Sequence, residues 1–306
     1  MYEPDTSTAL GNLQLKNPVM TASGCYGYGS EYRAMVSPET WGALVVKGTT
    51  RYPRNGNSPP RLVETPSGLV NSVGLQNPGI EEVIEREIPV LQEIKVPVII
   101  NLAGDTEEDY EYIARRLEGN TAVQAVEVNI SCPNVKKGGI SFGSDPETAK
   151  KLVEKVRSVF SRTMLVKLSP NTGNLPEIAA AVEAAGADAV SLINTLQAMV
   201  IDVKTQKPVL PEGTGGLSGP AVRPVAVRAV WEVAGAVSVP LVGMGGIFTP
   251  EDALQFILAG ASAVAVGTAV FVNPRVHLDI VEGIKDYMKL HGFRELPQMV
   301  GAARPR

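Results

Sequence analysis

The hydrophobic residues of the chain gather in short segments that recur along its whole length. Each segment is rich in β-branched residues and continuously apolar, instead of alternating between apolar and polar positions. Continuous apolar segments of this kind are typical of strands buried on both faces, as in a parallel sheet. Eight segments are therefore predicted to be strands: 18–22, 43–47, 97–101, 125–129, 164–168, 189–194, 240–244 and 263–267.

Between most of these strands the apolar positions change to a helical period, as at 106–119, 145–160, 175–186 and 249–260. Several helical segments open with Asp or Thr followed by Pro, and several end in Gly, which are start and stop signals of helices. Eight strand and helix units predict an α/β fold, a TIM (β/α)8 barrel that forms one domain over residues 1–306. A doubly wound open sheet is the alternative.

Polar residues stand at the ends of five predicted strands. In a closed barrel these ends converge on one face, where the catalytic residues of such folds collect. The pattern therefore favours the barrel, although a polar residue can also mark a strand end without any function. The five residues are Lys47, Asn101, Asn129, Lys167 and Asn194.

Two connections, 48–79 and 195–221, are longer than is usual between such elements. The first contains "NSVGLQNPG" (71–79) and the second contains "TGGLSG" (214–219). Small and amide residues of this kind line polar pockets, and long loops are usually functional or disordered. We expect both connections to contribute to a site.

The composition limits the class of protein. The chain has 306 residues, of which 44% are hydrophobic and 20% charged, as in a folded soluble protein. A net charge of −4 gives no basic footprint for nucleic acid or anionic lipid. The first residues do not resemble a signal peptide, and no apolar run reaches membrane-spanning length. We expect a cytoplasmic protein that binds neither nucleic acid nor membrane.

The chain contains two cysteines, Cys25 and Cys132, and two histidines, His277 and His291. Their spacing matches no metal-binding motif, so we expect no metal site. Disulfides are rare in a reducing compartment, and both thiols are expected to be free.

Glycine-rich loops follow the last two predicted strands, at 243–253 and 267–274, and each leads into a helix. Exposed backbone N–H groups at such positions attract anions, and these two loops are the usual phosphate site of a TIM barrel. Tight turns without a ligand are the alternative. Neither loop is a dinucleotide fingerprint or a P-loop. Flavin mononucleotide (FMN) fits better, with Lys47 and Lys167 available to the carbonyl edge of its ring.

Several motifs in the same order along the chain carry a resemblance to a known family. The chain resembles the FMN-containing catalytic subunit of class 1 dihydroorotate dehydrogenases, and "SGCYGYGSEY" (23–32) and "GLQNPGI" (74–80) look most like class 1B. The other motifs are "VVKGTT" (45–50), "VNISCPN" (128–134), "VKLSPN" (166–171), "INT" (193–195), "GGLSG" (215–219), "GMGGI" (243–247) and "VGTA" (266–269).

The resemblance implies that the protein oxidises dihydroorotate to orotate in pyrimidine biosynthesis, with reduction of FMN. Matching positions imply orotate contacts at Lys47, Asn71, Gly74, Leu75, Asn129, Asn134, Asn194 and Thr195. They imply FMN contacts at Ala22, Ser23, Lys47, Asn129, Lys167, Gly219, Gly245, Gly246, Gly267 and Thr268.

Cys132 falls on the catalytic base of the family. Oxidation of a carbon–carbon bond beside a carbonyl requires a group that removes the α-proton, and a thiol near neutral pKa is a competent base. Lys136 and Lys137 would favour its thiolate. Membrane-bound members of the wider family use serine here, so the cysteine favours the soluble class. A buried, inert thiol is the alternative and suits Cys25 better.

Class 1B resemblance also implies a partner, an iron–sulfur flavoprotein subunit that carries FAD and a [2Fe–2S] cluster and reduces NAD. Two cysteines and two histidines cannot ligate such a cluster in this chain. A heterotetramer built on a homodimer of this subunit is implied. The alternatives are a fumarate-dependent class 1A enzyme, an FMN-dependent dihydropyrimidine dehydrogenase and a non-catalytic barrel that binds a phosphorylated ligand.

Overall fold

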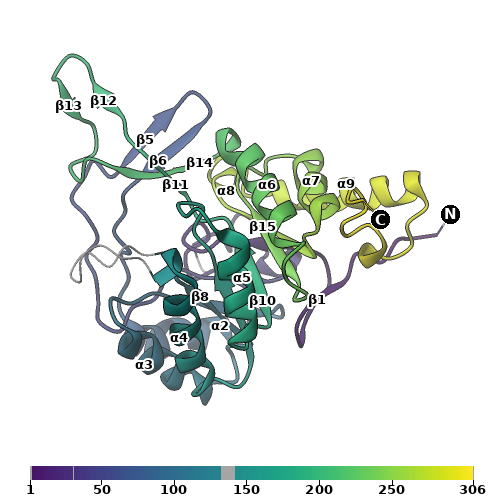
Figure 1. Cartoon of the computed structure of the whole chain (residues 1–306), viewed down its shortest axis with the longest axis horizontal. Coiled ribbons are helices and arrows are strands. Elements are labelled where there is room, and N and C mark those ends of the chain that lie inside the picture. The colour runs from purple at the N-terminus through teal and green to yellow at the C-terminus, as the bar shows by residue number, and fades with distance from the viewer. Residues whose placement is uncertain (1, 30, 132–141, 306) are drawn as a thin grey trace.

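A parallel barrel forms the centre of the computed structural model, which describes residues 2–29, 31–131 and 142–305 (Figure 1). Consecutive barrel strands are neighbours in an eight-stranded sheet. All the predicted strands are confirmed, and their bounds differ from the predicted ones by at most two residues. They are β3 (Val19–Thr21), β4 (Leu44–Val45), β7 (Val98–Leu102), β8 (Ala125–Asn129), β9 (Thr163–Lys167), β10 (Ala189–Leu192), β15 (Leu241–Met244) and β16 (Ala263–Val266).

The sheet closes between β3 and β4. Met20 and Ala43 form a parallel bridge, and the Thr21 N–H donates to the Ala43 carbonyl at 3.3 Å. The Thr21 hydroxyl extends the seam, because it accepts from the Val45 N–H at 2.8 Å. A doubly wound sheet would leave these edges unpaired, so the TIM barrel is confirmed and the open-sheet alternative is wrong.

Helices surround the barrel, and the four predicted ones are present with their caps. Thr106 and Thr249 each form a capping box with the Asp three residues later, and the Asp145 carboxylate accepts from the Thr148 N–H. The helices are α3 (Glu107–Glu118), α4 (Pro146–Arg157), α5 (Leu175–Ala184), α6 (Arg223–Val233), α7 (Pro250–Ala259), α8 (Ala269–Val272), α9 (Val276–His291) and a run of α1 (Ile80–Glu82), π-helical Val83–Glu87 and α2 (Ile88–Leu91).

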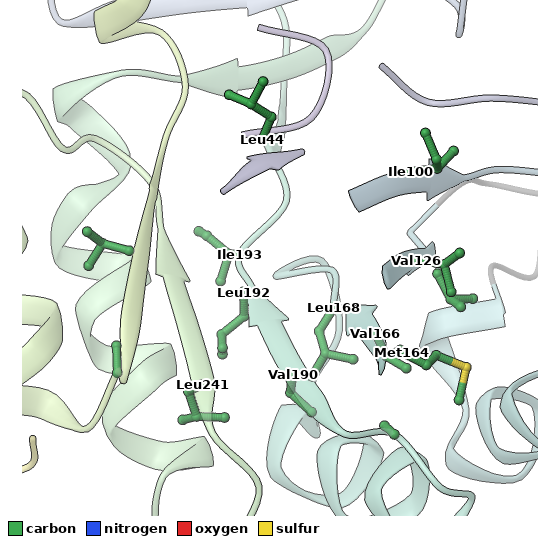
Figure 2. Close-up of a cluster of buried hydrophobic side chains, with 14 of the residues drawn as sticks. Leu44, Ile100, Val126, Met164, Val166, Leu168, Val190, Leu192, Ile193 and Leu241 are labelled. Carbon is green, nitrogen blue, oxygen red and sulfur yellow. The ribbon is translucent and has the colours of Figure 1, made fainter. Parts of the chain in front are cut away.

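The two faces of the barrel strands pack into separate cores. Outward side chains such as Val126, Val166 and Val190 lie between the sheet and the helices (Figure 2). Inward side chains form a second core of mostly small residues, which is joined by leucines from an N-terminal hairpin of β1 (Thr8–Leu10) and β2 (Leu13–Leu15). Burial on both faces explains why the strand sequences do not alternate.

The two long connections pair with each other. They form a four-stranded antiparallel sheet with β5 (Leu62–Thr65) and β6 (Gly68–Asn71) from the first connection, and β11 (Leu196–Ala198) and β14 (Gly215–Ser218) from the second. A hairpin of β12 (Ile201–Asp202) and β13 (Lys207–Pro208) extends from it, away from the barrel (Figure 1). We call this four-stranded sheet the lid sheet. Within the described ranges, no helix is long and apolar enough to cross a membrane.

His277 is fully buried beside the barrel. Its ring stacks on Trp41 with 3.8 Å between ring centroids, and its Nε2 lies 2.6 Å from the Thr40 hydroxyl oxygen. Burial lowers the pKa of His277 to about 4, from an ordinary value of 6.5. The folded protein therefore holds this imidazole neutral under conditions in which the unfolded chain would protonate it.

We expect this histidine to make the fold sensitive to acid. Between pH 6.5 and about 4 the unfolded state binds the proton and the folded state does not, so the His277 contribution to stability is complete above pH 6.5 and is lost as the pH falls toward 4. Thermal melts at pH 7 and pH 5 should show a smaller drop in Tm for His277→Gln than for the wild type. His291→Gln, at an exposed position, is the control. An equal drop in all three proteins would contradict the prediction.

Candidate active site

The polar residues predicted at the strand ends meet at one end of the barrel. Asn101, Asn129 and Lys167 lie within the last two residues of β7, β8 and β9, while Lys47 and Asn194 follow β4 and β10 by two residues. The Asn194 side-chain amide donates to the Asn129 Oδ1 at 3.4 Å. The prediction that these ends share one face of a closed barrel is confirmed.

Two lysines carry positive charge into this mouth. Lys167 is only 5% exposed, and its Nζ donates to the Ser23 hydroxyl at 3.1 Å across the barrel. Lys47 is half-buried; burial lowers its pKa, and the charge of Glu31 opposes that shift. Among the described residues, neither lysine has a carboxylate within ion-pairing distance. Glu31 acts on Lys47 from beyond ion-pairing distance, and buried cations without an ion-pair partner are costly, so the mouth is suited to an anionic ligand.

Amide and hydroxyl groups form a second cluster beside the lysines. The Asn129 Oδ1 also accepts from the Ser131 N–H at 3.2 Å, and the Asn194 Oδ1 accepts from the Thr195 N–H at 2.8 Å. Asn71, at the end of β6, donates to the Gly216 carbonyl at 3.1 Å. These bonds join Asn129 and Asn194 to their neighbours at the barrel end and fix Asn71 to the lid strand β14. Such groups offer both donors and acceptors without adding charge.

The lid reaches the mouth through positions that require unusual backbone or small side chains. A Cβ at Gly216 would lie 2.0 Å from the Thr195 hydroxyl oxygen. Gly74 and Leu75 have φ of 76° and 53°. The Leu75 side chain lies 3.5 Å from where a Cβ at Gly48 would be, next to Lys47. Positive φ at a non-glycine residue is uncommon and concentrates at functional loops.

Glycine loops follow β15 and β16, and β15 is the neighbour of the strand β10 that leads to Asn194. A Cβ at Gly246 would lie 2.7 Å from the Gly219 carbonyl oxygen, so the loop after β15 and the end of the lid sheet approach backbone to backbone. The Thr268 hydroxyl, after β16, donates to the Ser218 hydroxyl at 2.8 Å. We call this region the glycine cradle. Its residues are Ser218, Gly219, Gly245, Gly246, Gly267 and Thr268.

Ala22 and Ser23 continue the cradle toward Lys167. A Cβ at Gly267 would lie 3.5 Å from the Ala22 Cβ and 3.5 Å from the Cys25 Sγ. The structure thus brings together the residues predicted to hold FMN, while their role in binding stays a prediction. In the described ranges, no group of three or more His, Cys, Asp or Glu residues is arranged to hold a metal ion.

Of the two cysteines, only Cys25 lies within the described residues. Cys132 and Asn134 lie outside the described residues. Ser131, just before them, is fixed at the mouth, because its hydroxyl also donates to the Lys167 carbonyl at 3.4 Å. Cys25 is a free thiol, and burial raises its pKa to about 11 although the charge of Lys167 opposes the shift. It is therefore protonated and inert at neutral pH.

Sequence reasoning missed three polar residues at or below the mouth. Ser218 belongs to the cradle, and Asn171 donates to the Thr195 carbonyl at 3.0 Å. Glu127 lies inside the barrel, 1% exposed. Asn171 stands in a motif that carried the resemblance, and Glu127 lies two residues before Asn129 on the same strand and therefore on the same inward face, so both positions carried a signal in the sequence.

Comparison with known proteins agrees with this arrangement. A family model described as dihydroorotate dehydrogenase matches residues 6–288. The chain belongs to the dihydroorotate dehydrogenase family.

Close relatives within this family cover nearly the whole chain. A protein of Desulforamulus reducens is 53% identical over 96% of this chain and 97% of its own length. One of Trichlorobacter lovleyi is 51% identical over 98% and 99%, and one of Desulforudis audaxviator is 53% identical over 97% and 97%. All three relatives are named dihydroorotate dehydrogenase B (NAD(+)), catalytic subunit.

We expect Gly246→Ala to empty the glycine cradle. The new methyl group would clash with the Gly219 carbonyl, and φ of 74° would strain an alanine, so the loop must move away. The purified variant should retain a small fraction of the flavin absorbance of the wild type. Gly173→Ala is the matched control, since no atom lies within 4 Å of its Cβ position. Full flavin content in Gly246→Ala would show that the cradle does not bind the cofactor.

Proposed function

We propose that this chain is the catalytic subunit of an NAD-linked, class 1B dihydroorotate dehydrogenase, which oxidises dihydroorotate to orotate in de novo pyrimidine biosynthesis in the cytoplasm. The observation that carries the proposal is the meeting of Lys47 and Lys167, both without a carboxylate partner in the described structure, with the amide cluster at one barrel mouth. The names of the close relatives support the same activity.

FMN fits the mouth as its cofactor. The glycine cradle offers close backbone approach at Gly219 and Gly246 and the hydroxyl of Thr268 for one phosphate. Lys167 is buried at the other side with a neutral hydroxyl as its partner, which leaves its charge for the ring. FMN, when bound, accepts the hydride that leaves the substrate.

The amide cluster suits the substrate. Dihydroorotate presents amide-like edges and a carboxylate, which need donors, acceptors and a cation. Asn71, Asn129, Asn194 and Thr195 supply the first two, and Asn134 is proposed to join them. Lys47, whose pKa burial lowers, supplies positive charge at the mouth. Closure by the lid sheet would exclude water from the substrate.

Cys132 is proposed as the general base. The oxidation breaks two neighbouring C–H bonds: one carbon loses a proton, the other loses a hydride, and a C=C bond forms between them. The thiolate of Cys132 takes the proton. Ser131, which precedes Cys132 in the chain, is itself bonded at the mouth to the Asn129 side chain and to the Lys167 carbonyl. Cys25 cannot replace it, because its thiol stays protonated.

We expect Cys132→Ala to abolish oxidation of dihydroorotate without loss of flavin. Removal of a general base lowers the rate of flavin reduction about 100-fold or more, while the glycine cradle is untouched. Anaerobic stopped-flow absorbance of the flavin measures this step directly. Cys132→Ser should regain some activity at high pH only. Cys25→Ala, the control, should reduce its flavin at nearly the wild-type rate, and a wild-type rate in Cys132→Ala would refute the assignment.

Electrons are proposed to leave through a second subunit, an iron–sulfur flavoprotein with FAD and a [2Fe–2S] cluster, in a heterotetramer built on a dimer of this chain. An apolar surface beside the cradle supports such docking. Phe271 and Val272, in α8 just after Thr268, are 54% and 75% exposed, and Met35 is 57% exposed. The Arg275 guanidinium donates to the Met35 carbonyl and joins the two segments. Exposed apolar patches of this kind mark interaction sites.

Polar substitution of this surface should weaken the complex. We expect Phe271→Ser with Val272→Ser to weaken binding of the partner about tenfold or more, because apolar anchors dominate such interfaces. Isothermal titration or analytical gel filtration measures the affinity, and dihydroorotate oxidation with an artificial acceptor should not change. Leu290→Ser, equally apolar and 80% exposed near the end of α9, is the control. NAD reduction by the isolated chain would overturn the need for a partner.

A further inference from the structure

Glu127 is a buried carboxylate that the proposed chemistry leaves unused. It projects into the barrel from β8, one inward-facing position below Asn129, and is 1% exposed. Its Oε2 accepts from the Asn101 side-chain amide at 2.6 Å, and its Oε1 accepts from the Ser191 hydroxyl at 2.7 Å. Asn101 lies on the neighbouring strand β7, whereas Ser191 lies on β10, two strands away. The carboxylate therefore links side chains of β7 and β10 inside the barrel.

Among the described residues, Glu127 has no ion-pair partner. In the part of the chain that the structure describes, no Lys or Arg nitrogen lies within ion-pairing distance of Glu127, and its two partners are neutral. Lys167 stands one layer higher, as the register pairs it with Asn129 and with Ser191. Strand geometry puts the Lys167 and Glu127 Cα atoms roughly 8 Å apart. The Lys167 ammonium donates to Ser23 instead.

Packing alone does not explain a charged residue at this position. Of the four nearest inward positions in the sheet, Ala125 and Leu165 belong to the inner apolar core, while Asn101 and Asn129 are polar, so Glu127 stands at the boundary of that core. An aliphatic side chain would continue that core, and a buried charge without an ion-pair partner is costly to the fold. Such a residue, held by hydrogen bonds beneath the polar residues of the mouth, is a candidate for a functional role.

We propose that the negative charge of Glu127 makes the flavin at the mouth harder to reduce. The inference rests on the proposed function, because it requires FMN above Lys167. Lys167 favours negative charge on the reduced ring, and the carboxylate one layer below disfavours it. Their balance keeps the flavin reducing enough to pass electrons to an NAD-linked partner. Coulomb's law with an effective dielectric constant of about 20 gives a roughly tenfold change in the ratio of reduced to oxidised flavin for a unit charge about 10 Å away.

The test replaces the charge and keeps the shape. Glu127→Gln should raise the ratio of reduced to oxidised flavin about tenfold at a fixed ambient potential, which is about 30 mV for a two-electron couple. Spectroelectrochemical titration of the flavin-loaded chain measures this ratio. Glu127→Asp keeps the charge and should stay close to the wild type. Ser191→Ala, which removes one hydrogen bond and keeps the charge, separates the effect of the network from that of the charge.

The outcomes distinguish this inference from the function on which it rests. If Glu127→Gln does not retain flavin, Glu127→Asn against Glu127→Asp gives the same comparison of charge on a shorter side chain. A second readout is expected: in complex with the partner, Glu127→Gln should slow NAD reduction, while oxidation of dihydroorotate with a high-potential artificial acceptor should not be slowed. Equal potentials in the charged and neutral variants would overturn the role of Glu127. A wild-type chain that binds no FMN would overturn the proposed function instead.

Discussion

Closure of the barrel between β3 and β4 is the constraint on which the whole site depends. The hydrogen bond from the Lys167 ammonium to Ser23 joins β9 to the end of β3. Three strands, β16, β15 and β10, separate β3 from β9 in the sheet, so the two strands face each other across the closed barrel. In an open sheet these strand ends would be far apart. The seam at Met20 and Ala43 therefore does more than satisfy two sheet edges. It turns a row of strand ends into a ring and makes a single site from residues spread along the chain.

The side chains inside the barrel change from apolar at its amino end to polar and charged at the mouth. The inner core at the amino end is filled by Ala125, Ala189 and leucines of the N-terminal hairpin. Glu127 and Lys167 appear only toward the carboxyl ends, where each finds neutral hydrogen-bond partners. Because the surroundings are dry, these charges act over longer distances than they would in water. The same desolvation that makes them costly to the fold makes them effective on a bound ligand.

Sequence patterns predicted the barrel better than the lid, for a physical reason. A strand buried on both faces, such as β9, leaves a continuous apolar signal within five residues. The lid strands are short and partly exposed, and their pairing joins Asn71 to Gly216, which no local pattern encodes. The mouth residues could be predicted because each follows a strong strand signal. The partners of Glu127 lie on other strands, so its network could not be predicted before the strand order was known.

The lid couples the proposed substrate contacts to one another. Asn71 donates to the Gly216 carbonyl, while the missing side chain of Gly216 makes room for the Thr195 hydroxyl. Gly216 therefore binds the Asn71 amide of the first long connection and leaves space for the Thr195 hydroxyl of the second. The barrel floor, by contrast, is held by parallel strands that do not depend on the lid. The lid sheet also brings Ser218 and Gly219 to the glycine cradle, so movement of this sheet would alter Asn71 and the cradle together, whereas Lys167 would stay in place on its barrel strand.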